Sequence, residues 1–166
     1  MATLSEIRDP ASPRQAAGSM RDLARRAYLF GTWLMLVLII VQFTLAGAGV
    51  FSVLKGNSAG VYILFYHRGA GPILIFVLSL VMVLAAFVGR LPWRMTGLAA
   101  SFFPLLVLQS LFIIPYAYPK DIPGLASMPW LSALHVVNAL FIFWLAFQWP
   151  MWTRRDLATL PRIPRP

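Results

Sequence analysis

Four apolar runs, each long enough to cross a membrane as a helix, constrain this chain more than any other feature. They cover residues 28–50, 66–88, 96–116 and 129–149. The hydrocarbon core of a bilayer is about 30 Å thick, and a helix of about 20 apolar residues spans it. A lipid-exposed backbone has to satisfy its own hydrogen bonds, which an α-helix does within one segment. The sequence therefore predicts an all-α polytopic membrane protein, a four-transmembrane-helix bundle with the lipid bilayer around it.

The chain of 166 residues leaves no room for a separate soluble domain beside these spans. Ser19 and Asp22 have the spacing of a capping box, so we expect the first helix to begin near Met20. The predicted parts are a flexible cytoplasmic tail (1–19), a four-helix transmembrane domain (20–152) and a basic cytoplasmic tail (153–166).

Basic residues flank the apolar runs unevenly. The formal net charge is +9, which in a soluble protein would indicate a nucleic-acid partner. Here the positive-inside bias explains the charge better, and we expect no nucleic-acid partner. If the N-terminus is inside, eleven arginines flank the spans on the inner side, and the outer loops hold only Lys55, Arg68 and Lys120. The sequence therefore predicts four spans with both termini in the cytoplasm.

Polar side chains inside the spans are few. No Asp, Glu, Lys or Arg falls in the middle of any span, which removes the usual general acid and base pairs. We therefore do not expect enzyme activity from this chain on its own. Counting residues at 1.5 Å each places the main polar candidates in the outer part of the bilayer. They are Gln42, His67, Gln109, Ser110, His135 and Asn138.

The chain's only two histidines support one hypothesis for this polar cluster. Haem b needs a neutral imidazole on each face of its iron, and helix bundles build such sites from facing side chains. In this hypothesis His67 and His135 are the metal ligands, and Arg68 pairs with a haem propionate. The non-ligating imidazole nitrogens would be fixed by amides from Gln42, Gln109 and Asn138.

Two other interpretations stay open at this point. One histidine could ligate a chlorin or bond a quinone within a larger complex. Alternatively, His135 and Asn138 could bond to Gln42 and Gln109 and simply hold the helices together. The sequence also does not decide whether the second helix begins before or after His67.

Several short motifs resemble a family of small bacterial four-helix membrane proteins of unknown function. They are the segment 42–51, which closes the first span, then His67-Arg68-x-x-Gly71, Gln109 and Leu134-His135-x-x-Asn138. This resemblance implies a bacterial inner membrane location and no established activity. Histidines at the outer ends of the second and fourth spans are also similar, more loosely, to membrane b-type cytochromes.

Two functions are therefore expected from the sequence. The first is a haem b-binding redox or electron-transfer subunit with one outer-leaflet bis-histidine site. The alternative is a non-catalytic accessory or structural subunit of a larger respiratory or photosynthetic membrane complex, which would make other membrane-protein subunits its partners.

Overall fold

A computed structural model describes residues 13–117 and 129–160 of the chain. Within these residues every regular element is an α-helix. In chain order the helices are α1 (Pro13–Leu54), α2 (Ala59–Arg68), α3 (Ala70–Val88), α4 (Trp93–Ala117) and α6 (Pro129–Thr159).

The first helix begins earlier than the sequence predicted. It starts at Pro13 and not near Met20, so part of the expected flexible tail is helical. Proline is well suited to the first position of a helix, because its missing N–H would have no partner there. The expected capping pair therefore lies inside the helix, where Asp22 forms an ion pair of 2.9 Å with Arg26, one turn away. Residues 1–12 of the predicted tail lie outside the described residues.

The second apolar run forms two helices. α2 ends at Arg68, α3 begins at Ala70, and Gly69 lies between them with φ −98° and ψ −77°. The backbone N–H of Gly69 still donates to the carbonyl of Phe65, over 2.9 Å. The helix thus begins well before His67, which lies in the last turn of α2.

The last helix continues past the predicted end of the fourth span. α6 runs through Pro150 to Thr159, so the first half of the predicted basic tail is helical. Residues 161–166 of that tail lie outside the described residues.

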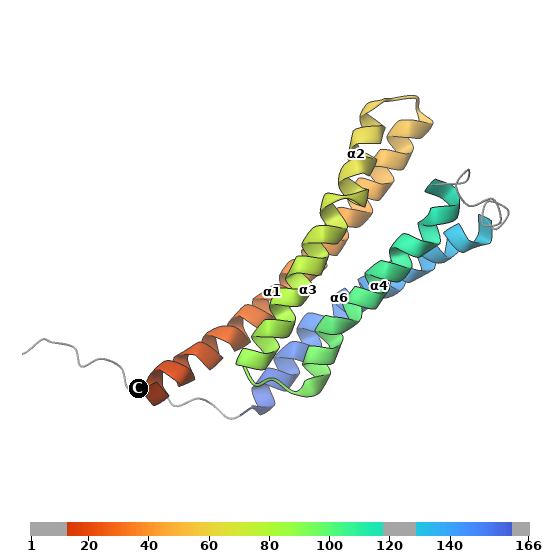
Figure 1. Ribbon diagram of the computed structural model, residues 1–166. Helices are drawn as coiled ribbons and strands as arrows, with labels where there is room; N and C mark the ends of the chain where they lie inside the picture. The colour runs from red at the N-terminus through yellow and green to blue at the C-terminus, as the bar shows by residue number, and fades with distance from the viewer. Residues whose placement is uncertain (1–12, 118–128, 161–166) are drawn as a thin grey trace, which may run out of the picture.

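The helices form two arms that meet at one end and diverge at the other (Figure 1). The first arm contains α1, α2 and α3, and the second contains α4 and α6. The joined end lies at the α3–α4 connection (residues 89–92), and the splayed end lies at the α1–α2 connection (residues 55–58). α2 packs against α1 and α3 and makes no comparable contact with the second arm.

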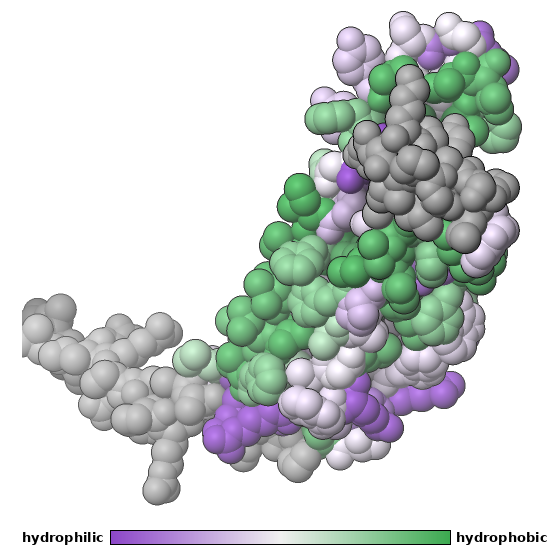
Figure 2. All heavy atoms as spheres, turned by 45° about the vertical axis from the view of Figure 1, so that its right-hand side comes forward, coloured by the Kyte–Doolittle hydropathy of each residue, from purple (hydrophilic) through white to green (hydrophobic). Residues whose placement is uncertain are grey.

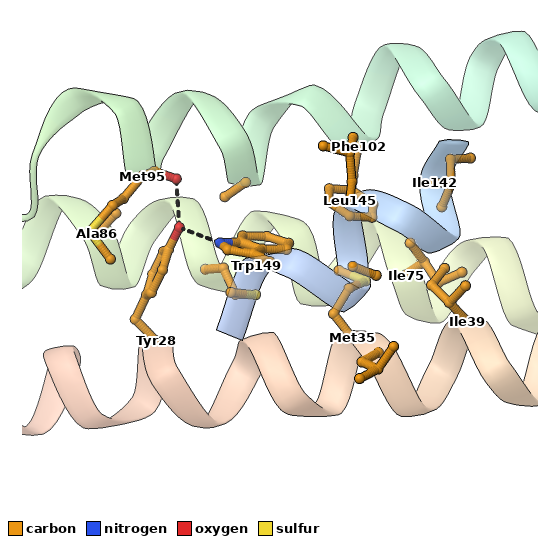
Figure 3. Packing of buried hydrophobic residues seen from close by; sticks show 14 of the residues in the cluster. Tyr28, Met35, Ile39, Ile75, Ala86, Met95, Phe102, Ile142, Leu145 and Trp149 are labelled. Atoms are coloured by element: carbon orange, nitrogen blue, oxygen red, sulfur yellow. Dashed lines mark hydrogen bonds between the residues drawn. The ribbon is translucent and has the colours of Figure 1, made fainter. Parts of the chain in front are cut away.

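The buried hydrophobic core occupies only the joined half of the molecule. Figure 3 shows its packing from close by. Its residues nearest the splayed end are Ile39 on α1, Ile75 on α3 and Ile142 on α6. Within the described residues no buried hydrophobic side chain lies further toward the splayed end. Packing in this core therefore holds the arms together at one end and leaves the other end without an apolar core between them.

The surface agrees with a membrane environment. The space-filling view shows a broad apolar band above a polar rim at the joined end (Figure 2). Four helical segments are long and apolar enough to cross a membrane: Gly18–Leu54, Ala59–Val88, Trp93–Ile113 and Trp130–Thr159. This confirms the predicted all-helical chain with four candidate spans.

Candidate functional site

The second arm carries a hydrogen-bonded cluster of three polar side chains, Gln109 on α4 and His135 and Asn138 on α6. The imidazole Nδ1–H of His135 donates to the backbone carbonyl of Gln109 over 2.9 Å. The side-chain amide of Gln109 donates to the imidazole Nε2 over 3.1 Å. The amide of Asn138 donates to the side-chain oxygen of Gln109, over 2.6 Å, and to the carbonyl of Leu105, over 3.0 Å. Four polar contacts thus join α4 to α6 where the apolar core has ended.

This geometry fixes the tautomer of His135. A backbone carbonyl can only accept, so the proton of a neutral imidazole lies on Nδ1. Nε2 then carries a lone pair, which receives the amide N–H of Gln109. An imidazole that donates from Nδ1 to a carbonyl and keeps a lone pair on Nε2 is oriented in the way that metal-ligating histidines commonly are.

The first arm carries a second polar group, formed by Gln42 on α1 and His67 on α2. The His67 ring forms a hydrogen bond with the backbone of Gln42. Its Nδ1 atom is buried and finds no hydrogen-bond partner among the described residues. A buried polar atom without a partner is uncommon in a folded protein and calls for an explanation.

Gly71, at the start of α3, makes this group possible. A Cβ atom built on Gly71 would lie 2.0 Å from the amide nitrogen of Gln42 and 2.2 Å from its amide oxygen. Such distances are far inside van der Waals contact, so the Gln42 amide rests directly on the backbone of α3. Glycine at this position lets α1 and α3 approach with a polar side chain between them.

The two polar groups lie on different arms. Gln42 and Asn138 are each about one turn beyond the last core isoleucine of their helices, so both groups begin where the core ends. His67 lies on the first arm, in the last turn of α2, and His135 lies on the second arm, in α6. Arg68 follows His67 at the end of α2 and is exposed.

Five of the six polar residues predicted from the sequence are therefore distributed between two groups. The structure brings together Gln109, His135 and Asn138, and it separately brings Gln42 to His67. The structural interpretation left open above also had His135 and Asn138 bonding to Gln42. No such bond is found among the described residues, where Gln42 lies on the other arm. Ser110 does not join either group, since its hydroxyl donates to the carbonyl of Leu106 on its own helix.

An apolar groove of about 420 Å³ lies beside the polar groups, between α3 and α4. Pro72 and Ile73 line it on α3, and Leu106 and Val107 line it on α4. Within it, the rings of Phe76 and Phe103 meet edge to face with centroids 4.9 Å apart.

A site built from three or more metal-ligating side chains is not found in the described part of the chain. Any metal held here would therefore depend on one or both histidines and on ligands from a cofactor. Haem supplies four of the six iron ligands itself and fits such a donor set.

Sequence reasoning missed the role of Gly71 and a polar contact at the joined end. Gly71 appears in the motif His67-Arg68-x-x-Gly71, and its spacing of one helical turn from His67 could have indicated a shared face. The joined-end contact is an ion pair between Arg94 on α4 and Asp156 on α6. The two residues are 62 positions apart in the sequence, so no local sequence pattern could have indicated their contact.

Comparison of the chain with protein-family models finds no match. Comparisons with curated proteins and with solved structures find none either. The resemblance to small bacterial four-helix membrane proteins remains a prediction from the motifs.

Proposed function

We propose that this chain is a multi-pass protein of the bacterial inner membrane with both termini in the cytoplasm. The start of α1, the α3–α4 connection and the end of α6 share the joined end (Figure 1). The arginines of the described residues at this end are Arg14, Arg21, Arg25, Arg26, Arg90, Arg94, Arg154 and Arg155. The positive-inside bias supports the cytoplasm as the side of the joined end and places the polar groups in the outer leaflet.

The function that the geometry supports best is a redox subunit that binds one haem b between the two arms. One observation carries this proposal: the chain's only two histidines lie on different arms, at the level where the apolar core between the arms ends. The arms diverge from this level toward the splayed end (Figure 1). A flat macrocycle held between them would meet one imidazole from each arm.

Both imidazoles fit the donor role. His67 has a buried nitrogen with no hydrogen-bond partner, which a metal ion would satisfy. His135 has its lone pair on Nε2 and is oriented by its Nδ1–H bond to the Gln109 carbonyl. A metal at Nε2 would displace only the side-chain amide of Gln109, which already interacts with Asn138 through its oxygen.

The chain's own residues would tune such a site. The carbonyl of Gln109 holds the His135 ring in one orientation, and the backbone of Gln42 does the same for His67. Arg68 is exposed beside His67 and has the charge to pair with a propionate. Bound haem would supply a one-electron couple, which suits an electron-transfer subunit and needs no acid or base from the protein.

A second function is favoured by a specific observation. Both ring nitrogens of His135 already have partners, so its cluster is complete as a structural link between α4 and α6. This supports a non-catalytic accessory subunit of a larger membrane complex, in which the cluster only holds the second arm together.

An optical spectrum separates the two proposals. The full chain is expressed with haem available, purified in mild detergent, and measured oxidised and reduced. The haem proposal expects sharp Soret and α bands that are lost in His67→Ala and in His135→Ala. Ser110→Ala is the matched control, because Ser110 neighbours Gln109 on α4 but bonds only to its own helix. A colourless wild-type protein would favour the accessory subunit, and bands that survive in both histidine variants would refute His67 and His135 as the ligands.

A further inference from the structure

A second cavity, of about 470 Å³, lies between α4 and α6 at the joined end. It is remote from both histidines, and the haem proposal makes no use of it. Its wall combines the cationic side chains of Arg94 and Arg155 with the apolar side chains of Met95, Leu98 and Trp152. Such a mixture matches a ligand with an anionic end and an apolar body.

The cationic side of the cavity is held in place. Arg94 forms an ion pair with Asp156, whose side chain is only 13% exposed. This bond uses one terminal nitrogen of the Arg94 guanidinium, which has five N–H donors in all. Arg155 adds a second guanidinium to the rim. The two arginines and the single carboxylate leave the cavity with a net positive charge.

Thr153 supplies an independent observation that points to a ligand. It lines the cavity, is only 1% exposed, and has no hydrogen-bond partner for its hydroxyl among the described residues. A threonine inside a helix normally donates to a carbonyl one turn earlier. A buried hydroxyl without this bond calls for an explanation, and a polar ligand in the adjoining cavity would supply one once the side chain turns toward it.

The level at which the cavity lies in the membrane indicates the class of ligand that it fits. It lies at the joined end, where the apolar band of the surface gives way to polar residues (Figure 2). Lipid headgroups occupy this level of a bilayer, and basic pockets between membrane helices bind anionic headgroups.

We propose that this cavity binds the headgroup phosphate of an anionic membrane phospholipid. Arg94 and Arg155 bond to the phosphate oxygens, the hydroxyl of Thr153 donates to one of them, and an acyl chain follows Leu98 and Trp152 into the bilayer. The bound lipid bridges α4 and α6 at the joined end, as the Gln109 cluster bridges them near the splayed end. This site requires no haem.

The neighbouring arginines offer a matched pair of variants. Arg155 lines the cavity, whereas the guanidinium of Arg154 lies 5.1 Å from the ring centroid of Trp33, on α1. Both are exposed, basic and at the same helix end, so Arg155→Gln and Arg154→Gln remove the same charge from the same level of the membrane.

The test uses the full chain in nanodiscs of phosphatidylcholine with a minor share of phosphatidylglycerol. Native mass spectrometry counts the phosphatidylglycerol that stays bound after extraction. Loss of a charge-assisted bond lowers affinity about tenfold, so we expect Arg155→Gln to lower retention about tenfold and Arg154→Gln to leave it near the wild-type value. Thr153→Val, which keeps the volume of the side chain, should also lower retention.

Two outcomes would overturn the proposal. Equal losses from Arg154→Gln and Arg155→Gln would show a general basic belt without a specific site. Binding of inorganic phosphate by a protein that retains no phosphatidylglycerol would show a free-anion site in place of a lipid site. The thermal unfolding temperature of each variant is measured together with its lipid retention. A variant that fails to fold is replaced by Arg94→Lys, which keeps the charge but loses the planar two-point contact.

Discussion

The indole N–H of Trp149 donates a hydrogen bond of 3.2 Å to the hydroxyl of Tyr28, across 121 residues of sequence (Figure 3). The same hydroxyl donates to the carbonyl of Met95 over 2.6 Å. Tyr28 and Trp149 are fully buried, and Phe102 stacks on the indole with ring centroids 5.0 Å apart. One phenol thus links α1 to both helices of the second arm. It stabilises the joined end from which the arms diverge.

Tyr28→Phe should destabilise the protein. The change leaves the carbonyl of Met95 and the indole N–H of Trp149 without these partners in a buried site, at a cost of about 1–3 kcal/mol. Thermal unfolding in detergent, followed by tryptophan fluorescence, measures the loss. Tyr62→Phe is the control, because Tyr62 is 70% exposed and should tolerate the change. Equal unfolding temperatures for the two variants would contradict the linking role of Tyr28.

Gly71→Ala should disturb the polar group on the first arm. The added methyl would occupy the position of the Gln42 amide, which has to move. Overpacking of this kind costs about 1–3 kcal/mol. Gly47→Ala is the matched control, since a Cβ on Gly47 meets no atom within 4 Å. The double variant Gly71→Ala, Gln42→Ala should recover much of the loss, because the smaller side chain removes the clash. A double variant no more stable than Gly71→Ala would argue against contact with Gln42 as the cause.

The sequence allowed the helical class, the four candidate spans and the contact of His135 and Asn138 with Gln109 to be predicted, for physical reasons. Apolar length alone identifies a membrane helix. Polar residues within spans are rare enough that Gln109, His135 and Asn138 stood out, and the structure brings these three together.

The division of the cluster between two arms could not be predicted. It depends on where the apolar core ends, and that is decided by the packing of four helices against one another. Each helix is apolar on most sides, so its sequence does not show which side faces the core. The break at Gly69 was only partly predictable. His67 and Arg68 before it and Gly71 and Pro72 after it interrupt the apolar run, but the sequence left open whether the helix begins before or after His67. The bonds from Tyr28 and Arg94 join residues remote in sequence, for which no local pattern exists.

Gly60→Ala should loosen the hairpin formed by α1 and α2. A Cβ at Gly60 would lie 2.7 Å from the carbonyl oxygen of Gly49 and 2.7 Å from the backbone nitrogen of Val53. Backbone atoms cannot move aside as a flexible side chain can, so the two helices have to separate. Trypsin cleavage after Lys55, in the connection between them, should become several-fold faster.

The control for this hairpin is Gly97→Ala on α4. A Cβ on Gly97 meets no atom within 4 Å, and the change carries the same gain in helix propensity. Cleavage after Lys55 should keep its wild-type rate in this variant. A rate that stays at the wild-type value in Gly60→Ala as well would refute the close approach of α1 and α2.

Asn138→Leu should weaken the second arm and release the amide of Gln109. The buried Asn138 amide donates to the side-chain oxygen of Gln109 and to the carbonyl of Leu105, and leucine fills its volume without either bond. Interhelical hydrogen bonds in membrane proteins contribute about 0.6 kcal/mol on average and up to about 2. We therefore expect a loss of about 1–2 kcal/mol, measured by unfolding in detergent.

Ser110→Ala should change stability by less than about 0.5 kcal/mol, because Ser110 is exposed and bonds only within α4. If the two variants unfold alike, Asn138 does not join α4 to α6.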